Sequence, residues 1–523
     1  MDIRLPPRLA RFGFLQSVLP AVSFSIAPST REMSSWVAGL PAEQPLVVLD
    51  SLAERAKAVA HSSVSPSRRF RQLEQLAQHA EPLLKRLEAQ LDACRLPLDS
   101  ASKAAANTAD RLLKSLSEAH LHIVQTIKPS SIQRRLHGKT FAMAMLRAAQ
   151  LINRRSAVVH RAHAAGSPRR WKLLRKLLEI GEQYALLNQP AIPGSSDTLE
   201  QAIARECLMS LCDPASLENS ELGRIRFYIE RFGHLAKLRK EVSLFEDTSA
   251  GLFVFGNGPR GPSQLRADQV LGDKERVLDC RELLARARHH LAGLRQGLHA
   301  TKLGLPMVAN EASYAYMLSR CVEQWSEAKT RRHTREDYLP LAELVSGFDA
   351  IRQFLSSTAF RRRESDRLQG AGAGLSVASE WRILDQSRSG FGLRQASAHT
   401  LPVSIGEVVA MRPLERSHVH ICVTRRLRHE DEGCNIGLER LSGSALPTLI
   451  EKTLADGSTH SIPVLLLPRS VCFDGGPAML APHDDVTVGM VLRVAQREGD
   501  LRFRLEGVSE RLASCELWQL TRI

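Results

Sequence analysis

A polar segment at residues 385–390, which reads DQSRSG, carries three residues that together suit ligand binding. The residues before it, 380–384 (EWRIL), are typical of a strand, so the sequence predicts a strand that runs into a tight polar turn. Asp385 supplies a carboxylate acceptor, and Ser387 supplies a hydroxyl that donates or accepts. We interpret Gly390 as a position that allows positive φ and lets a ligand approach the backbone.

The carboxylate of Asp385 is a candidate reader of guanine. The Watson–Crick edge of guanine presents two parallel donors, N1–H and the exocyclic amine, and a carboxylate can accept both. Adenine presents an acceptor at N1, so the same carboxylate discriminates against it. Ser387, two residues further on, can add a bond on the same side. An alternative stays open for this segment alone, in which Asp385 and Ser387 only satisfy the backbone of their own turn.

An arginine-rich segment at 330–337 (TRRHTRED) directly precedes the first strand expected in the C-terminal part, at 338–345. It contains Arg331, Arg332 and Arg335, and the first and last of these form an RxxxR pair. A guanidinium binds phosphate oxygens in a bidentate manner, matches guanine O6 and N7, and stacks on a base. Together with the Asp-x-Ser-x-x-Gly segment, it indicates a site for a guanine dinucleotide.

A second RxxxR pair, Arg363 and Arg367, lies closer to the polar turn, in the stretch 361–367 (RRRESDR). Both pairs are candidates for the phosphate contact. We favour Arg331 and Arg335, because that pair directly precedes a strand and would be held at the edge of the predicted β structure.

Other kinds of site lack their sequence signatures. The close histidine pairs have no carboxylate or cysteine partner at metal-ligand spacing; these pairs are His160 with His163, His289 with His290, and His418 with His420. The chain contains no nucleophile elbow, phosphate-binding loop or glycine-rich dinucleotide fingerprint. The nine cysteines include no CxxC, which favours buried free thiols in a reducing cytosol. We therefore expect neither a metal nor a cofactor nor an enzymatic activity.

The composition bounds the partners. With 523 residues, of which 43% are hydrophobic, the chain is long enough for about three domains of roughly 150 residues. Its net charge of +15 favours anionic partners. In the stretch 169–176 (RRWKLLRK) the basic residues fall between apolar ones, so we interpret them as a solvated helix face and do not predict nucleic-acid binding there. No run of about 18 apolar residues predicts a membrane span.

The N-terminal half has helical periodicity. Apolar residues recur at three- and four-residue steps from Phe70 to Leu91, after an N-cap candidate at Ser65 and Pro66 in the first turn. Further helices are predicted at 102–127, 139–164, from 168 onward, 197–211, 217–238, 275–298 and 308–328. Between them, the glycine- and proline-rich residues 246–275 predict a loop or linker with one short strand at 252–255.

After residue 335 the hydrophobic period changes to two. Val419, Ile421 and Val423 alternate with other residues, the stretch around Phe503 and Leu505 does the same, and 463–467 is a short buried-type run. A helix is expected to interrupt the strands at 347–367. The fold class that follows is α+β multidomain, with an N-terminal all-α domain and a C-terminal antiparallel β-barrel that carries extra strands.

These motifs resemble the PilZ domain, a bacterial receptor module for cyclic di-GMP. The similarity covers about 330–445 and rests on RxxxR before a strand, on Asp-x-Ser-x-x-Gly after one, and on the closing strand pair, where 435–439 (NIGLE) replaces the family's usual Gly-Val-x-Phe. The chain also resembles PilZ proteins with a long helical domain in front, through 34–41 (SSWVAGLP), 207–217 (CLMSLCDPASL) and 314–336. The resemblance implies a six-stranded barrel that holds the dinucleotide between the arginine segment and the Asp-x-Ser segment.

Two departures from the PilZ pattern stand out. Fifty residues separate Arg335 from Asp385, more than is usual in the family, and the helix expected at 347–367 fills the gap. Phe391 stands where the family often has a second glycine. Some PilZ domains have lost nucleotide binding, so a degenerate PilZ adaptor that binds a protein partner without nucleotide is an alternative, and a basic nucleic-acid-binding protein is another.

The sequence thus predicts a cytoplasmic, non-enzymatic cyclic di-GMP receptor that signals by interdomain rearrangement to an unidentified protein partner, in a process such as motility, biofilm adhesion or polysaccharide secretion. The expected parts are a disordered extension at 1–32, a helical domain at 33–245, the linker at 246–275, connecting helices at 276–329, the PilZ-like barrel at 330–445 and additional strands at 446–523.

Overall fold

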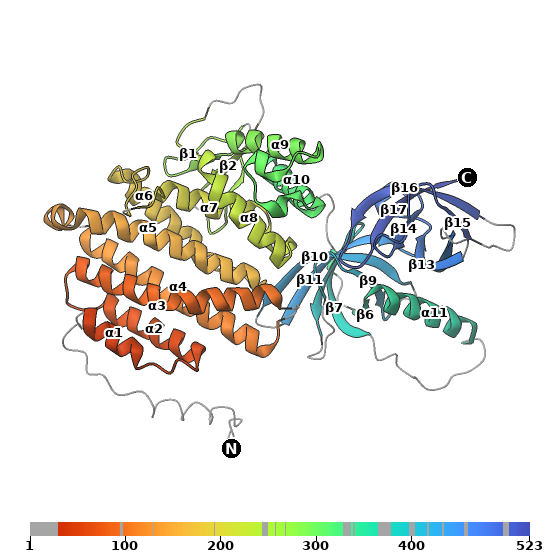
Figure 1. Ribbon diagram of the computed structural model, residues 1–523, viewed down its shortest axis with the longest axis horizontal. Helices are drawn as coiled ribbons and strands as arrows, with labels where there is room; N and C mark the ends of the chain where they lie inside the picture. Colours follow the sequence, from red (N-terminus) through yellow and green to blue (C-terminus); the bar gives the residue numbers. More distant parts are fainter. Residues whose placement is uncertain are drawn as a thin grey trace, which may run out of the picture.

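The protein folds into a helical half and a β half, which lie side by side in the computed structural model (Figure 1). The structure describes residues 30–94, 98–128, 130–192, 194–242, 249–256, 258–266, 268–327, 336–337, 340–364, 378–396, 403–415, 418–430, 433–453, 459–494 and 501–523. The predicted fold class, α+β multidomain with helices before antiparallel strands, is confirmed. Among the helices in these ranges, none is long and apolar enough to cross a bilayer.

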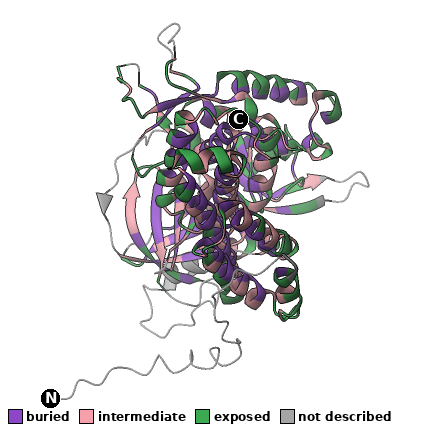
Figure 2. Ribbon diagram, turned by 90° about the vertical axis from the view of Figure 1, so that its left-hand side faces the viewer, coloured by how far each residue is buried: buried purple, intermediate pink, exposed green. Residues whose placement is uncertain are grey.

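Ten helices of the described chain build the helical half. Their bounds are α1 (Thr30–Ala38), α2 (Pro45–Ala60), α3 (Pro66–Ala93), α4 (Ser100–Ile127), α5 (Ser131–Arg161), α6 (Arg169–Gln183), α7 (Leu199–Leu211), α8 (Asn219–Phe232), α9 (Arg281–Arg295) and α10 (Ala312–Ser326). Figure 2 looks onto this half and shows the buried residues between the helices and the exposed ones around them. One hydrophobic core runs from α1 to α10.

Helix α3 shows how the pattern becomes structure. Pro66 occupies the first helical turn after Ser65, although the Ser65 hydroxyl makes no capping bond to the helix. The predicted apolar stripe from Phe70 to Leu91 faces the core and is buried, apart from half-buried Ala77. Each fully buried leucine contributes about 1.5–3 kcal/mol relative to an exposed one.

The chain between α8 and α9 differs from its prediction. Residues expected to be the end of one helix, a linker and the start of the next helix form a four-stranded sheet in the order β1-β4-β2-β3. Its strands are β1 (Lys237–Arg239), β2 (Leu252–Phe255), β3 (Ser263–Gln264) and β4 (Arg276–Asp279). The strand expected at 252–255 is confirmed, but β4 occupies the start of the helix expected at 275–298. Phe253, Phe255 and Leu278 join the helical core, so burial rather than propensity decides these short strands.

Six strands of the β half close into a barrel. Around the ring they are β7 (Ser379–Ser387), β6 (Leu341–Ser346), β9 (Val408–Pro413), β10 (His420–Glu430), β11 (Gly433–Ser442) and β8 (Gly390–Gln395), and β8 pairs again with β7. Trp381, Ile383, Phe391 and Leu438 fill the interior. A two-residue strand, β5 (Glu336–Asp337), pairs with β7 on the same edge as β6, beside a later part of β7.

A second sheet packs on this barrel. It contains β12 (Leu446–Thr453), β13 (Thr459–Leu467), β14 (Ala478–Ala481), β17 (Glu516–Arg522), β16 (Leu501–Arg511) and β15 (Val491–Val494), in this order. The predicted alternation is confirmed in β16, where Phe503 and Leu505 are buried. Helix α11 (Phe348–Glu364) follows β6, as predicted, and Ile351 and Phe354 share a core with both sheets.

Candidate functional site

The segment 385–390 forms the end of one strand, a turn and the start of the next. Strand β7 ends at Ser387 and β8 begins at Gly390, so only Arg388 and Ser389 make the turn. The predicted order of strand and turn is confirmed, but the turn is shorter than expected. Asp385 lies within β7, in register with Gly392, because backbone pairing with β8 extends the strand beyond the apolar residues that suggested it.

Asp385 faces the outside of the barrel. A register shift between Ile383 and Asp385 leaves Ile383 in the core and turns the half-buried Asp385 outward. A Cβ on Gly392 would lie 2.7 Å from Asp385 Oδ1, so any larger residue there would displace the carboxylate. Gly392, the residue after Phe391, therefore leaves the room for the Asp385 side chain. The sequence alone did not reveal this role of Gly392.

Gly390 has a different role from the one predicted. Its φ lies outside the left-handed region, so conformational freedom is not what the position requires. A Cβ on Gly390 would lie 2.0 Å from the Leu438 carbonyl oxygen and 3.1 Å from the carbonyl carbon. The interpretation of Gly390 as a positive-φ residue is therefore wrong, and the glycine instead allows β8 to approach the backbone of β11.

Arg440 on β11 holds the turn in place and was not singled out from the sequence. Its Nη2 donates to the Ser387 carbonyl at 2.8 Å, and its backbone N–H donates to the Ser389 carbonyl at 2.8 Å. Its guanidinium also lies over the Phe391 ring, at 5.0 Å from the centroid. The Ser387 hydroxyl makes long contacts of 3.3 Å to Ser389 Oγ and 3.4 Å to the Gly390 carbonyl, so it is positioned by its own turn.

The arginine segment itself, with Arg331, Arg332 and Arg335, lies outside the described residues. The chain on its C-terminal side is described and is held against the site. Glu336 pairs with Gln386, and Asp337 pairs with Asp385. The strand expected at 338–345 is found as β6, which begins at Leu341, and β5 comes from the end of the segment 330–337, where no strand was expected. Pro340, which has no N–H, lies between β5 and β6.

The second arginine pair belongs to a different part of the barrel. Arg363 is in the last turn of α11, with only its backbone described, and Arg367 lies outside the described residues. Helix α11 starts after β6, next to the Ser379 end of β7, whereas Ser387 is at the other end of that strand. Figure 1 shows α11 leading away from β6 and β7.

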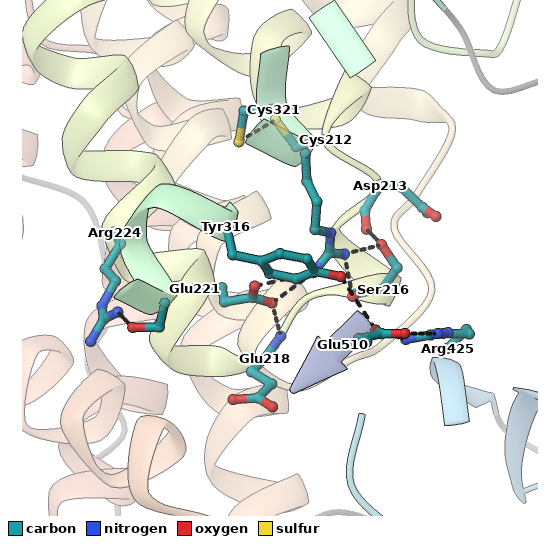
Figure 3. Close-up of polar contacts among 12 residues, drawn as sticks. Cys212, Asp213, Ser216, Glu218, Glu221, Arg224, Tyr316, Cys321, Arg425 and Glu510 are labelled. Carbon is teal, nitrogen blue, oxygen red and sulfur yellow. Dashed lines mark hydrogen bonds and ion pairs between the residues drawn. The ribbon is translucent and has the colours of Figure 1, made fainter. Parts of the chain in front are cut away.

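A chain of charged groups connects the site strands to helix α10. Arg425 on β10 donates from Nε to Glu439 at 2.6 Å and from both Nη atoms to Glu510 at 2.5 and 2.7 Å. Burial alone would lower the pKa of Arg425, but Glu510 and Glu439 raise it above its ordinary value. The Tyr316 hydroxyl of α10 donates to Glu510 at 3.3 Å (Figure 3). Glu439 pairs with Gly390, so this network joins the β7–β8 turn to the helix that leads into the arginine segment.

A second contact joins the two halves through His163 and His429. The His429 N–H donates to the His163 carbonyl at 2.6 Å, and the Leu98 N–H donates to His429 Nε2 at 3.2 Å. Burial lowers the pKa of His163 to about 4, and burial likewise lowers the pKa of His429 to about 4. Both imidazoles are therefore neutral at pH 7.

We expect His163→Asn to reduce the acid sensitivity of the protein. Unfolded histidine titrates near 6.5 and folded His163 near 4, so the unfolded state binds more protons as the pH falls between these values. The free energy of unfolding then decreases, by about 2 kcal/mol at pH 5 for this residue. Asparagine tolerates the φ of +48° at this position. Melting temperatures at pH 7.5 and 5.0 should differ less in the variant than in the parent; an equal difference would contradict this account.

A groove of about 550 Å³ lies elsewhere, between α4, α5, α6 and the tip of the β10–β11 hairpin. Two of its cationic side chains are paired with acids: Arg155 binds both Asp110 oxygens at 2.6 and 3.0 Å, and Arg169 lies 3.7 Å from Glu118. None of the residues predicted to bind ligand lines it. We therefore place the candidate site on the β7–β8 hairpin.

The cysteines and histidines behave as ordinary structural residues. All nine cysteines are free thiols and most are buried, as predicted, with half-buried Cys94 and exposed Cys472 as the exceptions. Cys212 and Cys321 lie within the core, with their Sγ atoms 3.9 Å apart (Figure 3). Across the described ranges, no group of three or more His, Cys, Asp or Glu side chains is arranged to hold a metal ion.

With this geometry established, the helical half can be compared with known families. Residues 31–241 match the N-terminal domain of the cyclic-di-GMP receptor FimW. No curated protein matches the chain. The part that matches the FimW domain runs from α1 to just past β1, so it covers the helices that contact the barrel through His163.

Proposed function

We propose that this protein is a cyclic di-GMP receptor that binds the dinucleotide through the RxxxR segment and the Asp-x-Ser-x-x-Gly hairpin of a PilZ-like barrel. The carrying observation is the pairing of β5 with β7. It places the residue after Arg335 in register with Gln386, between Asp385 and Ser387 in the sequence, although fifty residues separate the two motifs. The FimW match over 31–241 supports the same ligand from the other half of the chain.

Each motif has a defined part in this proposal. Asp385, on the outer face, accepts the two donors of the guanine edge, and Ser387 adds a hydroxyl at the turn. Arg331, Arg332 and Arg335 supply the phosphate and stacking contacts. Gly390 acts indirectly, since it sets the close contact of β8 and β11 that fixes the hairpin. The proposed receptor is cytoplasmic and acts without catalysis.

The proposed signal is a shift in the interdomain arrangement. A ligand that contacts both the arginine segment and the hairpin favours the arrangement in which both reach it. The arginine segment follows α10, whose Tyr316 hydroxyl donates to Glu510 on β16, and Glu510 in turn binds Arg425 of the barrel. Ordering of the segment would therefore favour one position of the FimW-like helices relative to the barrel. That position determines which helical surface is exposed to a protein partner.

Calorimetry on the full chain tests the function. Cyclic di-GMP should bind saturably, cyclic di-AMP should bind much more weakly, and Asp385→Asn should weaken cyclic di-GMP binding by roughly tenfold or more, because an amide offers one acceptor where guanine presents two donors. Equal affinity for both dinucleotides would remove the guanine-reading role of Asp385. Absence of binding would favour the adaptor that recognises only a protein.

The net charge of +15 also fits a nucleic-acid-binding protein. The dependence of binding affinity on salt concentration distinguishes such a protein from the receptor. Binding of duplex DNA loses about 0.9 log units of affinity per log unit of salt for each neutralised phosphate. A cyclic dinucleotide has only two phosphates, so its affinity should fall modestly between about 50 and 200 mM salt. Two results together would overturn the proposal: tight, steeply salt-dependent binding of duplex DNA by the parent, and an Asp385→Asn variant that binds cyclic di-GMP as well as the parent does.

A further inference from the structure

Four residues form one row across the outer face of the barrel. Asp385 pairs with Gly392, Gly392 pairs with Gly437, and Gly437 pairs with Arg426, on strands β7, β8, β11 and β10. Residues in one cross-strand row project from the same face of a sheet. Between β7 and β10, the only side chains in this row are therefore the carboxylate of Asp385 and the guanidinium of Arg426.

Both side chains extend over the glycines between them. The position of a Cβ on Gly392 is 2.7–3.1 Å from the carboxyl group of Asp385, and that of a Cβ on Gly437 is 3.2 Å from Arg426 Cβ and 3.9 Å from its Cδ. Neighbouring strands are about 4.8 Å apart. The stem of Arg426 is thus about one strand spacing from the carboxylate that we assign to guanine.

The guanidinium of Arg426 binds the helical half. Its Nε and Nη2 both donate to Oδ2 of Asp213, at 2.9 and 2.6 Å. Asp213 follows α7, within the region that matches the FimW domain, and adopts a left-handed conformation with φ of +50°. It lies beside Ser216 at the interface (Figure 3). The Arg426 side chain is 57% exposed, so incoming ligand has access to it.

We propose that Arg426 is a phosphate-binding residue of the dinucleotide site and that Asp213 competes with the ligand for it. This proposal rests on the proposed function. Both donors of Arg426 share one carboxylate oxygen, whereas a phosphate offers two oxygens for the bidentate geometry that guanidinium prefers. Exposed ion pairs contribute little to stability, so the exchange is feasible. Binding at the barrel then releases an interdomain contact, which couples the ligand to the helical half.

Opposite effects of two substitutions test this competition by calorimetry with cyclic di-GMP. Arg426→Gln should weaken binding by about tenfold. Asp213→Asn, which keeps the side-chain shape and suits the left-handed backbone, should tighten binding by about two- to fivefold. Asp213→Asn should have no effect when Arg426→Gln is already present. Glu311→Gln is the matched control, because it removes the same charge from an acid that binds Arg224 at 2.7 Å, and it should leave the affinity unchanged.

The outcomes separate this inference from the function on which it rests. If the parent binds cyclic di-GMP and Asp385→Asn weakens it, but Arg426→Gln has the parent affinity or Asp213→Asn binds no tighter, the competition is overturned and the receptor stands. If Asp213→Asn and Glu311→Gln increased the affinity equally, the increase would come from the change in net charge, and the competition would also be overturned. If the parent does not bind, both proposals fall.

Discussion

Gly390→Ala should destabilise the barrel by at least about 3 kcal/mol and abolish cyclic di-GMP binding. The added methyl would lie 2.0 Å from the Leu438 carbonyl oxygen, and a backbone carbonyl held in a sheet cannot rotate away as a side chain can. Relief requires β8 to separate from β11, which opens the barrel between these two strands and moves Asp385 and Ser387 with the hairpin. Calorimetric unfolding and ligand titration measure the two effects.

Gly507→Ala on β16 is the matched control for this substitution. A Cβ on Gly507 has open space within 4 Å, and its φ is outside the left-handed region. Its melting temperature and affinity should therefore stay close to those of the parent. Parent-like stability and binding in Gly390→Ala would show that the β8–β11 contact does not constrain the hairpin, and the role we assign to Gly390 would be wrong.

The elements that the sequence predicts well are those decided by local periodicity. The stripe on α3 and the alternation on β16 each present one apolar face to a core, and both are found as expected. Strands β1 to β4 were largely missed because each has at most four residues, too few to show a period. Their strand conformation depends on pairing with one another and on burial of Phe253 and Phe255 against distant helices.

The site shows the same division between local and distant causes. Asp385 and Ser387 could be selected from their chemistry and spacing, and the structure brings β5 beside them. The need for glycine at 390 comes from Leu438, the position of the turn depends on Arg440, and the room for Asp385 comes from Gly392. These contacts cross between strands that are joined only in the folded barrel, so a short motif cannot contain them.

Arg335→Ala should weaken cyclic di-GMP binding roughly 10- to 150-fold, whereas Arg367→Ala should have little effect. The loss corresponds to one charge-assisted hydrogen bond, about 1.5–3 kcal/mol. The choice between the pairs follows from β5: Glu336, next to Arg335, is bonded into the site strand at Gln386, while α11 carries Arg363 away from the Ser387 end of β7. Isothermal titration of the parent and both variants measures the difference directly.

A lysine substitution decides whether Arg335 acts as a charge or as a planar fork. Arg335→Lys keeps the positive charge but loses the paired donors and the flat stacking face. If the guanidinium binds phosphate bidentately or stacks on guanine, lysine should recover only part of the affinity that alanine loses. Full recovery would leave a purely electrostatic role. If Arg367→Ala instead produced the large loss and Arg335→Ala did not, the phosphate contact would belong to the Arg363–Arg367 pair, and the pairing of β5 with β7 would have only a structural role.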